Sequence, residues 1–348
     1  MEEGERIYVG VDVHKKSYHV ALWSRDRECL VTVWSQPSQG QVLADRLDPI
    51  RSAVVRVFYE AGPTGFGLAR DLRERGYEVE VVSPAHTKRP AVRQAKTDSL
   101  DCRELARQGA KSELHPVYVP TIEEEQDRQL VRLRQQRRDR CKEIKMQIKS
   151  FLLYHGIAEP PGLKTWSAKA VKQLRGLRLS ERLRRCLDLL LDDLERAEEA
   201  LKEVTREVKA LSAGPRFKEG TALCVTVPGI AEVTAMGIQT EMLAPGRFHR
   251  AADVSSYQGL APGIRASGET VRLQGLMKTG NPRLKTILVE AAWCWVRYDA
   301  GARKLYHRLL GRLRLKQKAI VAMARRLGII LWRMLTRKEP YRGATAAA

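Results

Sequence analysis

The sequence has few cysteines and no long apolar run, and each absence excludes a class of protein. Its six cysteines are scattered, without a CxxC pair or histidines at zinc-ligand spacing, so we expect reduced, mostly buried thiols. Three arginines interrupt the apolar stretch 319–335, which excludes a plain transmembrane helix. The acidic start, MEEGER, lacks the apolar segment typical of a secretory signal. We therefore expect a cytoplasmic protein with no membrane partner.

Acidic residues are scarce relative to basic ones. The chain of 348 residues has 62 Lys and Arg against 41 Asp and Glu, a formal net charge of +21. This balance favours a polyanionic partner, and nucleic acid is the leading candidate. Thirteen basic residues and a single acid, Glu339, lie between positions 301 and 342. Solubility alone is the alternative explanation, but such clustering favours a surface that faces phosphates.

The first third of the chain alternates strand and helix patterns. Three apolar runs separated by polar turns predict an antiparallel meander, and two further strands, each preceded by a helix, follow it. The predicted strands are 7–13, 18–23, 29–34, 54–59 and 79–82, and the predicted helices are 41–47, 64–75 and 98–108. This order is that of the ribonuclease-H-like fold, which includes the RuvC branch of Holliday-junction resolvases. A fold alone does not fix a function.

The rest of the chain is predicted to be mainly helical. A charged helical segment spans about 121–155 and is followed by the break Glu159-Pro160-Pro161-Gly162. A second helix has an apolar heptad seam, which predicts an antiparallel coiled-coil arm with the first. The seam consists of Leu183, Leu187, Leu190, Leu194, Ala197, Leu201, Val204, Val208 and Leu211, and its partial match of Cys141, Ile144, Ile148 and Phe151. Dimerisation through this arm and packing within its own domain both remain open.

We expect three domains: an α/β domain at 1–118, a helical connector at 119–215 and a mainly α-helical domain at 216–348. In the last, the turn 227–230 is predicted to lead into a helix N-terminus. Such a turn can present backbone N–H groups to a phosphate, or it can be an ordinary turn between helices.

Four carboxylates lie where predicted elements end or begin. Asp12 lies on the strand face opposite the apolar row of 7–13, Glu60 ends a strand before a Gly-rich turn, and Asp98 and Asp101 share a helix face. Gathered together they would repel one another, whereas two Mg²⁺ ions would satisfy them and grip a scissile phosphate. Each acid alone has a structural explanation, as a solvated strand end or in the first turn of a helix.

A second candidate site is the stretch 257–285, which is rich in glycine and basic residues. Ser267 precedes a glycine there, so its hydroxyl has room to approach a phosphate while nearby Arg or Lys stabilises an oxyanion. A serine before glycine is also a common turn residue. No histidine lies at an obvious spacing to act as its base.

Several of these motifs together resemble one known family. The segments YVGVDVHK (8–15), YEAGPTG (59–65), KTDSLD (96–101), Pro-Gly-Ile (228–230) and the stretch 257–285 are similar to the DEDD-type insertion-sequence transposases, described as bridge-RNA-guided recombinases. The resemblance covers nearly the whole chain. It implies a RuvC-like catalytic domain, a coiled-coil connector and a C-terminal transposase domain with a catalytic serine. The implied site residues are Asp12, Glu60, Asp98, Asp101 and Ser267, with Ser255, Ser256 and Thr270 as rivals for the serine.

The resemblance also implies an activity and partners. It implies a transposase or site-specific recombinase that cuts and rejoins donor and target DNA, with Mg²⁺ at the four acids and a covalent phosphoserine link. Its implied partners are both DNAs, a structured bridge RNA and further copies of the chain, as a dimer or tetramer in which different protomers supply the acids and the serine. The implied location is the prokaryotic cytoplasm, at the nucleoid when acting.

Two other functions remain open at this point. The first is a metal-dependent DNA junction-resolving nuclease that uses a metal-activated water, with Ser267 structural. The second is an architectural nucleic-acid-binding protein whose acids are vestigial.

Overall fold

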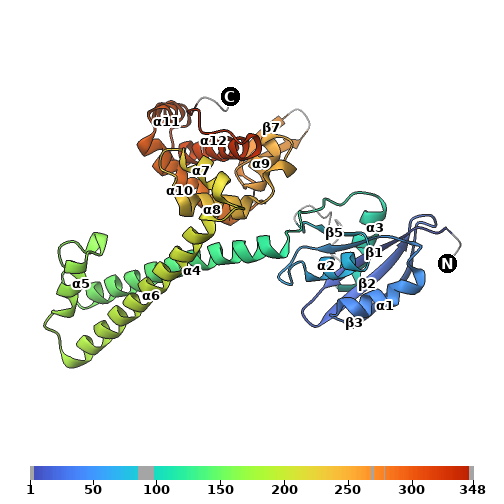
Figure 1. The fold of residues 1–348 in the computed structure, drawn as a ribbon, viewed down its shortest axis with the longest axis horizontal. Coiled ribbons are helices and arrows are strands. Elements are labelled where there is room, and N and C mark those ends of the chain that lie inside the picture. Colours follow the sequence, from blue (N-terminus) through green and yellow to red (C-terminus); the bar gives the residue numbers. More distant parts are fainter. Residues whose placement is uncertain (1–3, 85–97, 268–269, 278, 345–348) are drawn as a thin grey trace. The chain divides into compact units, whose positions relative to one another are not determined.

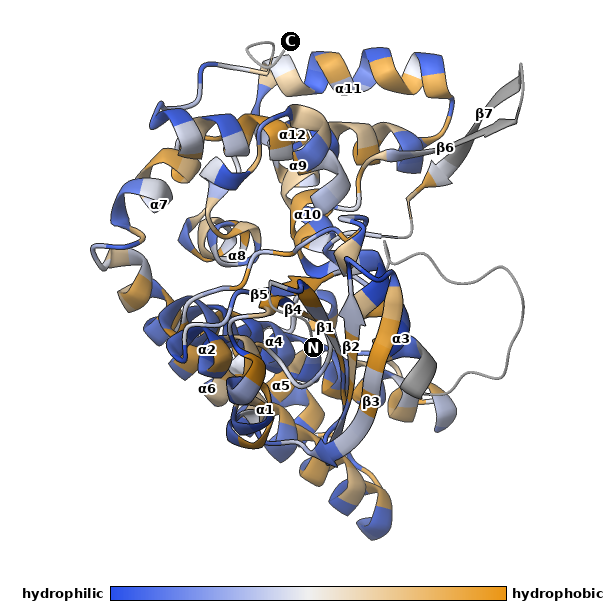
Figure 2. Cartoon of the chain, turned by 90° about the vertical axis from the view of Figure 1, so that its right-hand side faces the viewer, coloured by the Kyte–Doolittle hydropathy of each residue, from blue (hydrophilic) through white to orange (hydrophobic). Residues whose placement is uncertain are grey.

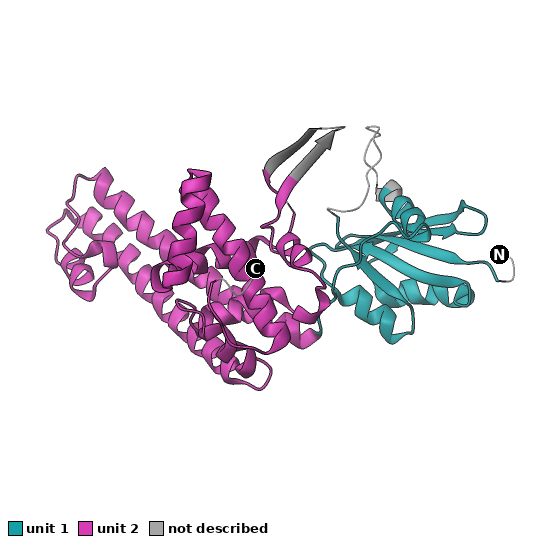
Figure 3. Cartoon of the chain, turned by 90° about the horizontal axis from the view of Figure 1, so that it is seen from above, with its two compact units in different colours: residues 1–121 teal, residues 122–348 magenta. Residues whose placement is uncertain are grey.

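The chain forms two compact units in a computed structural model that describes residues 4–84, 98–267, 270–277 and 279–344 (Figure 3). The first unit is 1–121 and the second is 122–348. For residues 98–100, 264–267 and 270–274 only the backbone is described. The predicted division at 118 and 215 stays a prediction.

The first unit is a mixed α/β domain (Figure 1). Its described strands form a five-stranded sheet in the order β3-β2-β1-β4-β5. The strands β1, β4 and β5 are parallel to one another, and β2 is antiparallel to both of its neighbours, β1 and β3. The strands are β1 (Ile7–Val13), β2 (Ser17–Ser24), β3 (Cys29–Pro37), β4 (Val54–Glu60) and β5 (Val79–Val82). The helices are α1 (Gly40–Leu47), α2 (Gly67–Glu74) and α3 (Asp98–Ala110). The predicted meander and the order of elements are confirmed.

Helices cover both faces of this sheet because its strands are apolar on both faces. The row Ile7, Val9 and Val11 is fully buried in one core with residues of α1 and α2. On the other face, α3 packs against β1 and β2. The sheet is therefore the middle layer of three.

The helix predicted at 64–75 begins three residues later than expected. A turn precedes it, in which the N–H of Gly65 donates to the carbonyl of Gly62 at 3.2 Å and Gly65 has a φ of +73°. Its end was predicted correctly, because Gly76 follows it with a φ of +80°.

The second unit is mostly helical, with one hairpin among its described residues. Its elements are α4 (Ile122–Tyr154), α5 (Ala168–Arg175), α6 (Glu181–Ala213), α7 (Lys218–Val225), α8 (Glu232–Met242), α9 (Ala251–Tyr257), β6 (Pro262–Ser267), β7 (Thr270–Leu276), α10 (Pro282–Tyr298), α11 (Ala300–Leu313) and α12 (Lys316–Arg337). The turn predicted at 227–230 leads into α8, and Gly229 in it has a φ of +90°.

The helices α4 and α6 form an antiparallel pair, which we call the arm (Figure 1). The direction follows from two contacts: Arg134 bonds to Thr205, whereas Lys145, further along α4, pairs with Glu198, earlier in α6. The predicted seam is correct in part. Leu187, Leu194, Val204 and Val208 are buried, but so is Leu191, whereas Leu190 is only partly buried. The helix α5 packs on the arm and shifts the buried stripe, a tertiary contact that a heptad pattern does not include.

The core of the second unit lies among α7–α12, around Trp295 of α10 and the apolar face of α12. No helix among the described residues is long and apolar enough to cross a membrane. The cysteines are free thiols, but the expectation that most are buried is wrong: Cys102, Cys141 and Cys224 are buried, whereas Cys186 and Cys294 are exposed. Cys29 is of intermediate exposure.

Candidate active site

Asp12 and Glu60 lie at the carboxyl ends of two neighbouring parallel strands. In the register of β1 and β4, Gly10 lies opposite Phe58 and Val11 opposite Tyr59. The next step of the same register places Asp12 opposite Glu60, on the face of the sheet that Gly10 occupies. Both carboxylates are partly buried. The sheet therefore brings together two acids that are 48 positions apart in the chain.

The helix α3 lies directly on this face of the sheet. A Cβ on Gly10 would lie 2.1 Å from the carbonyl oxygen of Cys102, and one on Gly109 would lie 2.3 Å from the ring of Phe58. Two glycines, one on each side of the contact, thus allow helix and strands to approach closely. Asp98 begins α3 and Asp101 lies in its first turn, exposed. The N-terminal turn of α3 and the two strand ends belong to one face.

Asp12 interacts with two neighbouring side chains, those of Cys102 and His14. Burial, and then the negative charge of Asp12, raise the pKa of the Cys102 thiol to about 11, which places the carboxylate near the start of α3. The Nε2 of His14 lies 3.2 Å from the Oδ2 of Asp12. We did not single out His14 in the sequence. The sequence pattern that could have indicated His14 is its position two residues after Asp12, since residues two apart in an extended segment share a face.

The donor chemistry of these acids suits a hard divalent cation, which prefers carboxylate oxygens. Among the described residues, however, no group of three or more His, Cys, Asp or Glu is arranged to hold a metal ion. The side chain of Asp98 lies outside the described residues. The structure thus places Asp12 and Glu60 on neighbouring strand ends and Asp101 in the first turn of the helix on the same face. The predicted metal site of four acids stays a prediction.

Ser267 is the last residue of β6, in the hairpin β6–β7 of the second unit. It lies opposite Thr270, and its side chain lies outside the described residues. The base of the hairpin is tightly held. A Cβ on Gly280 would lie 2.5 Å from the backbone nitrogen of Gly259, and the N–H of Asn281 donates to the carbonyl of Tyr257 at 2.7 Å. The backbone that carries Ser267 therefore leaves the helical core at a fixed place.

The rival serines differ in access. Ser255 is fully buried in α9; its hydroxyl donates to the carbonyl of Ala251 at 2.8 Å and accepts from the Nε of Arg325 at 3.1 Å. A nucleophile must reach its substrate, so these contacts assign Ser255 to helix packing. Ser256 is partly buried. As with Ser267, the side chain of Thr270 lies outside the described residues.

Glu241 of α8 is a buried acid that we missed in the sequence. Its side chain accepts from the Nε of Arg132 at 2.6 Å and from the Nδ2 of Asn281 at 2.9 Å. Burial raises the pKa of Glu241, but these hydrogen bonds outweigh burial and hold the pKa below its ordinary value. Asn281 also caps α10, so Glu241 ties the arm to the base of the hairpin. The available signal was its place between Thr240 and Met242, at the end of a helix whose other residues are mostly apolar or neutral.

The basic tract 301–342 does not form a single surface, contrary to the expectation. Arg325 and Arg326 are partly buried and bond to Ser255 and to the carbonyl of Ala344. Lys338 and Arg342 form ion pairs with acids. Several other cations of the tract are exposed and form no ion pair with an acid in the described part of the chain. We call six of them, which lie from α11 to the first turn of α12, the α11 face. It consists of Lys304, Arg308, Arg312, Arg314, Lys316 and Lys318. In Figure 2, α11 alternates between hydrophilic and hydrophobic residues.

Comparison with known proteins adds the family context. Residues 9–156 match the sequence model DEDD_Tnp_IS110, described as "Transposase", and residues 222–307 match "Transposase IS116/IS110/IS902 family". The chain is 32% identical over 306 residues to a putative transposase, y4qE, of Sinorhizobium fredii, covering 86% of this chain and 74% of that protein. It is 26% identical to the transposase of insertion sequence element IS1328 of Yersinia enterocolitica, covering 94% and 96% of the two chains. For the transposase of element IS1533 of Leptospira borgpetersenii the identity is 26%, and the shares are 97% and 98%.

Proposed function

The chain belongs to the IS116/IS110/IS902 family of insertion-sequence transposases, and from this we propose that it cuts and rejoins donor and target DNA with four acids and a serine. The family establishes a DNA transposase, and its DEDD domain implies a divalent metal, usually Mg²⁺. The proposal assigns the acids to Asp12, Glu60, Asp98 and Asp101 and the serine to Ser267.

One observation carries the assignment of the acids. Asp12 and Glu60 end adjacent parallel strands on the face that the first turn of α3 covers, and that turn contains Asp98 and Asp101. Two of the acids thus end neighbouring strands and two begin the helix on the same face, which supports a shared site. The strand order, with a meander followed by parallel β4 and β5, supports the ribonuclease-H-like, RuvC-like description of this unit.

In the proposed reaction the hydroxyl oxygen of Ser267 attacks the scissile phosphorus. A phosphoserine bond forms as a bond from phosphorus to a deoxyribose oxygen breaks, and that oxygen leaves with a proton. Attack on the phosphoserine by the hydroxyl end of another strand then restores a phosphodiester and frees the serine. Mg²⁺, held by the four carboxylates, would supply charge stabilisation at the phosphoryl oxygens. No step consumes an external energy source.

Three further parts of the proposal follow the family resemblance. A structured bridge RNA from the element pairs with both DNAs and supplies the choice of sequence, while the protein recognises phosphates and shape. The chain acts as a dimer or tetramer, in which one protomer supplies the acids and another supplies the serine. The arm, as a coiled coil, contributes to this assembly. The α11 face supports a nucleic-acid partner, because its cations are exposed and not neutralised by acids.

The test is a search for the covalent intermediate. Purified protein is incubated with the element-encoded RNA, labelled donor and target DNA and Mg²⁺, and the products are separated on a denaturing gel. We expect a protein–DNA adduct in the wild type and none in Ser267→Ala, because only the serine oxygen bonds to phosphorus. Asp12→Ala is expected to lose cleavage, since the acids stabilise the reacting phosphate.

Controls separate this proposal from its rivals. Ser256→Ala is the matched variant, a serine close in sequence that should keep the adduct. Cleavage without any adduct in the wild type would instead favour a junction-resolving nuclease that uses water. An adduct that survives Ser267→Ala would move the nucleophile to another residue, and binding without cleavage in any metal would favour the architectural role.

A further inference from the structure

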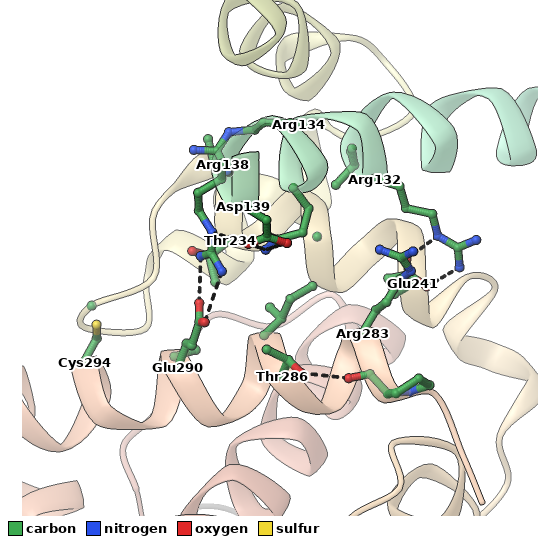
Figure 4. Close-up of a pocket in the computed structure, with 18 residues that line it drawn as sticks. Arg132, Arg134, Arg138, Asp139, Thr234, Glu241, Arg283, Thr286, Glu290 and Cys294 are labelled. Carbon is green, nitrogen blue, oxygen red and sulfur yellow. Dashed lines mark hydrogen bonds and ion pairs between the residues drawn. The ribbon is translucent and has the colours of Figure 1, made fainter. Parts of the chain in front are cut away.

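A cavity of about 430 Å³ opens within the second unit, between α4, α8 and α10 (Figure 4). Three arginines from the arm helix α4 line it, Arg132, Arg134 and Arg138, and Arg283 lines it from α10. The apolar or small part of the lining includes Val233, Gly237, Ile287 and Ala291, and polar residues such as Gln135, Thr234 and Thr286 also line the cavity. An apolar pocket with a few charged groups at its edge is typical of a ligand site.

Three acids line the cavity, Asp139, Glu241 and Glu290, and each lies beside Arg132 or Arg138. The Oδ1 of Asp139 lies 3.8 Å from the Nε of Arg138. Glu241 bonds to Arg132 at 2.6 Å, and Glu290 bonds to Arg138 at 2.9 Å. The two other cations, Arg134 and Arg283, form no ion pair with a carboxylate in the described part of the chain. Four arginines and three carboxylates leave the lining with one net positive charge, and the cations without a carboxylate partner among the described residues are Arg134 and Arg283.

Arg134 is an unusual cation for this position because it is partly buried. Its Nε donates to the hydroxyl of Thr205 at 3.0 Å, a neutral acceptor. Burial lowers the pKa of Arg134, and the charge of Arg138, one helical turn away, lowers it further. A cation that is partly removed from water without a counter-charge is destabilised, and a bound anion would relieve this.

We infer that this cavity binds a phosphate group of a single-stranded nucleic acid, held by Arg134 and Arg283, with the adjoining sugar or base against the apolar lining. Arginine is suited to phosphate because its guanidinium donates two parallel hydrogen bonds. The apolar lining lies inside the cavity, where a base can reach it only when it is unpaired, so we assign the site to a single strand. The inference rests on the nucleic-acid partner of the proposed function, but requires neither Mg²⁺ nor Ser267.

A cysteine in the cavity lining can report on ligand binding through its rate of chemical modification. Cys294 lines it and is exposed, whereas Cys186, on α6, is equally a free exposed thiol but does not line it. The intact protein is treated with a small thiol-alkylating reagent, without metal, and the modification rate of each cysteine is measured by mass spectrometry. The probes are a single-stranded DNA oligonucleotide, the RNA of the same sequence, a DNA duplex and inorganic phosphate.

We expect a single-stranded oligonucleotide to slow the modification of Cys294 at least several-fold and to leave Cys186 unchanged. Comparison of the DNA and RNA arms identifies the source of the strand. Unchanged rates at Cys294 with both single strands would overturn the inference. So would equal protection by inorganic phosphate and by the oligonucleotides at the same concentration, or stronger protection by the duplex than by either single strand.

Variants then locate the contact. Arg134→Gln should abolish the protection of Cys294, whereas Arg134→Lys should keep part of it. The matched control is Arg137→Gln, which removes an exposed cation from the same helix outside the cavity. Equal loss in both glutamine variants would mean that net charge, not the cavity, binds the strand. Thr286→Phe, at an exposed lining position, tests the site independently by filling it without a change of charge, and unaltered protection there would also contradict the inference.

This experiment separates two failures. If strand transfer proceeds but no single strand protects Cys294 from alkylation, the inference about the cavity is wrong and the proposed function is unaffected. If the protein binds no nucleic acid by any measure, both fall.

Discussion

At the scale of single residues, the candidate site depends on the space that a glycine without a side chain leaves for a neighbouring helix. The helix α3 can lie on β1 because Gly10 has no side chain, and Asp12, two residues later, then shares a face with the first turn of that helix. Glu241 shows the opposite case, a charged group that the core accepts because Arg132 and Asn281 satisfy it.

Gly10→Ala tests the close approach of α3. The new Cβ would lie 2.1 Å from the carbonyl oxygen of Cys102, so helix and strand must separate. We expect a loss of about 3 kcal/mol in the free energy of unfolding, at the upper end for overpacking, together with loss of DNA cleavage. Chemical denaturation measures the first. The control is Gly67→Ala, where no atom lies within 4 Å of the new Cβ; a similar loss there would contradict the explanation.

Glu241→Gln tests the buried ion pair and its pH dependence. The folded-state pKa of Glu241 lies below its ordinary value of 4.5, so its contribution is fully present above that pH and is lost as pH falls through the lowered value. We expect the variant to be about 3–5 kcal/mol less stable than the wild type at neutral pH, because Arg132 is left uncompensated. The difference should shrink in acid.

Denaturation curves of the wild type and Glu241→Gln at neutral and acidic pH provide the measurement. Glu143→Gln, which breaks an exposed pair with Arg140, is the control and should change stability little at either pH. If the difference in free energy of unfolding between wild type and Glu241→Gln grew in acid, the pKa of Glu241 would not be lowered in the folded state and the explanation would be wrong.

At the scale of elements, the arm shows how a local pattern is modified by a neighbour. The heptad seam of α6 predicts Leu190 inside, yet Leu191 is buried because α5 packs on that side. The arm therefore has its own small core, which includes Ile144, Ile148 and Leu152 of α4.

Ile148→Ala tests this core. Ile148 is fully buried between the arm helices, so its truncation leaves a cavity, and we expect the arm to lose about 2–5 kcal/mol. Hydrogen exchange of the α4 and α6 amides should accelerate, while the sheet of the first unit is unaffected. Met146→Ala, two residues earlier and 59% exposed, should change neither. Equal acceleration in both variants would argue against a packed arm.

At the scale of the whole molecule, the net charge of +21 is distributed unequally. Many charges of the arm are paired with acids in adjacent turns or across the helix pair, as between Arg196 and Asp193 or Lys145 and Glu198. The α11 face has no such partners among the described residues. Affinity for nucleic acid should therefore depend on where a cation lies as well as on how many there are.

Replacement of Lys304, Arg308 and Arg312 by Gln tests the α11 face. If each contacts a phosphate, the slope of log affinity against log salt concentration should fall by up to about 3. Fluorescence anisotropy with a labelled oligonucleotide at several salt concentrations measures it. The control replaces three ion-paired arm cations, Arg140, Arg196 and Lys202, for an equal change of charge. A slope that fell equally in both variants would show that only net charge matters.

Much of the architecture was predictable from the sequence because it depends on local patterns. The strands of the first unit and the order of its elements follow from alternating and apolar runs, and Gly76 ends α2 as its conformational freedom allows. The start of α2 was not predictable, since it depends on a turn at Gly62–Gly65 that delays the helix. Membership of the family could also be predicted from the sequence, because the family's motifs are short and contiguous.

By itself, the sequence determined most of the secondary structure, the excess of positive charge and the motifs that identify the family, all properties of neighbours along the chain. Only the tertiary structure decided which residues meet. It placed Asp12 and Glu60 on neighbouring strand ends under α3, buried Ser255 and paired Glu241 with Arg132. It also divided the basic tract and placed Arg134 in a cavity, where it forms no ion pair with an acid among the described residues. These outcomes depend on close packing between segments far apart in sequence, which no local period encodes.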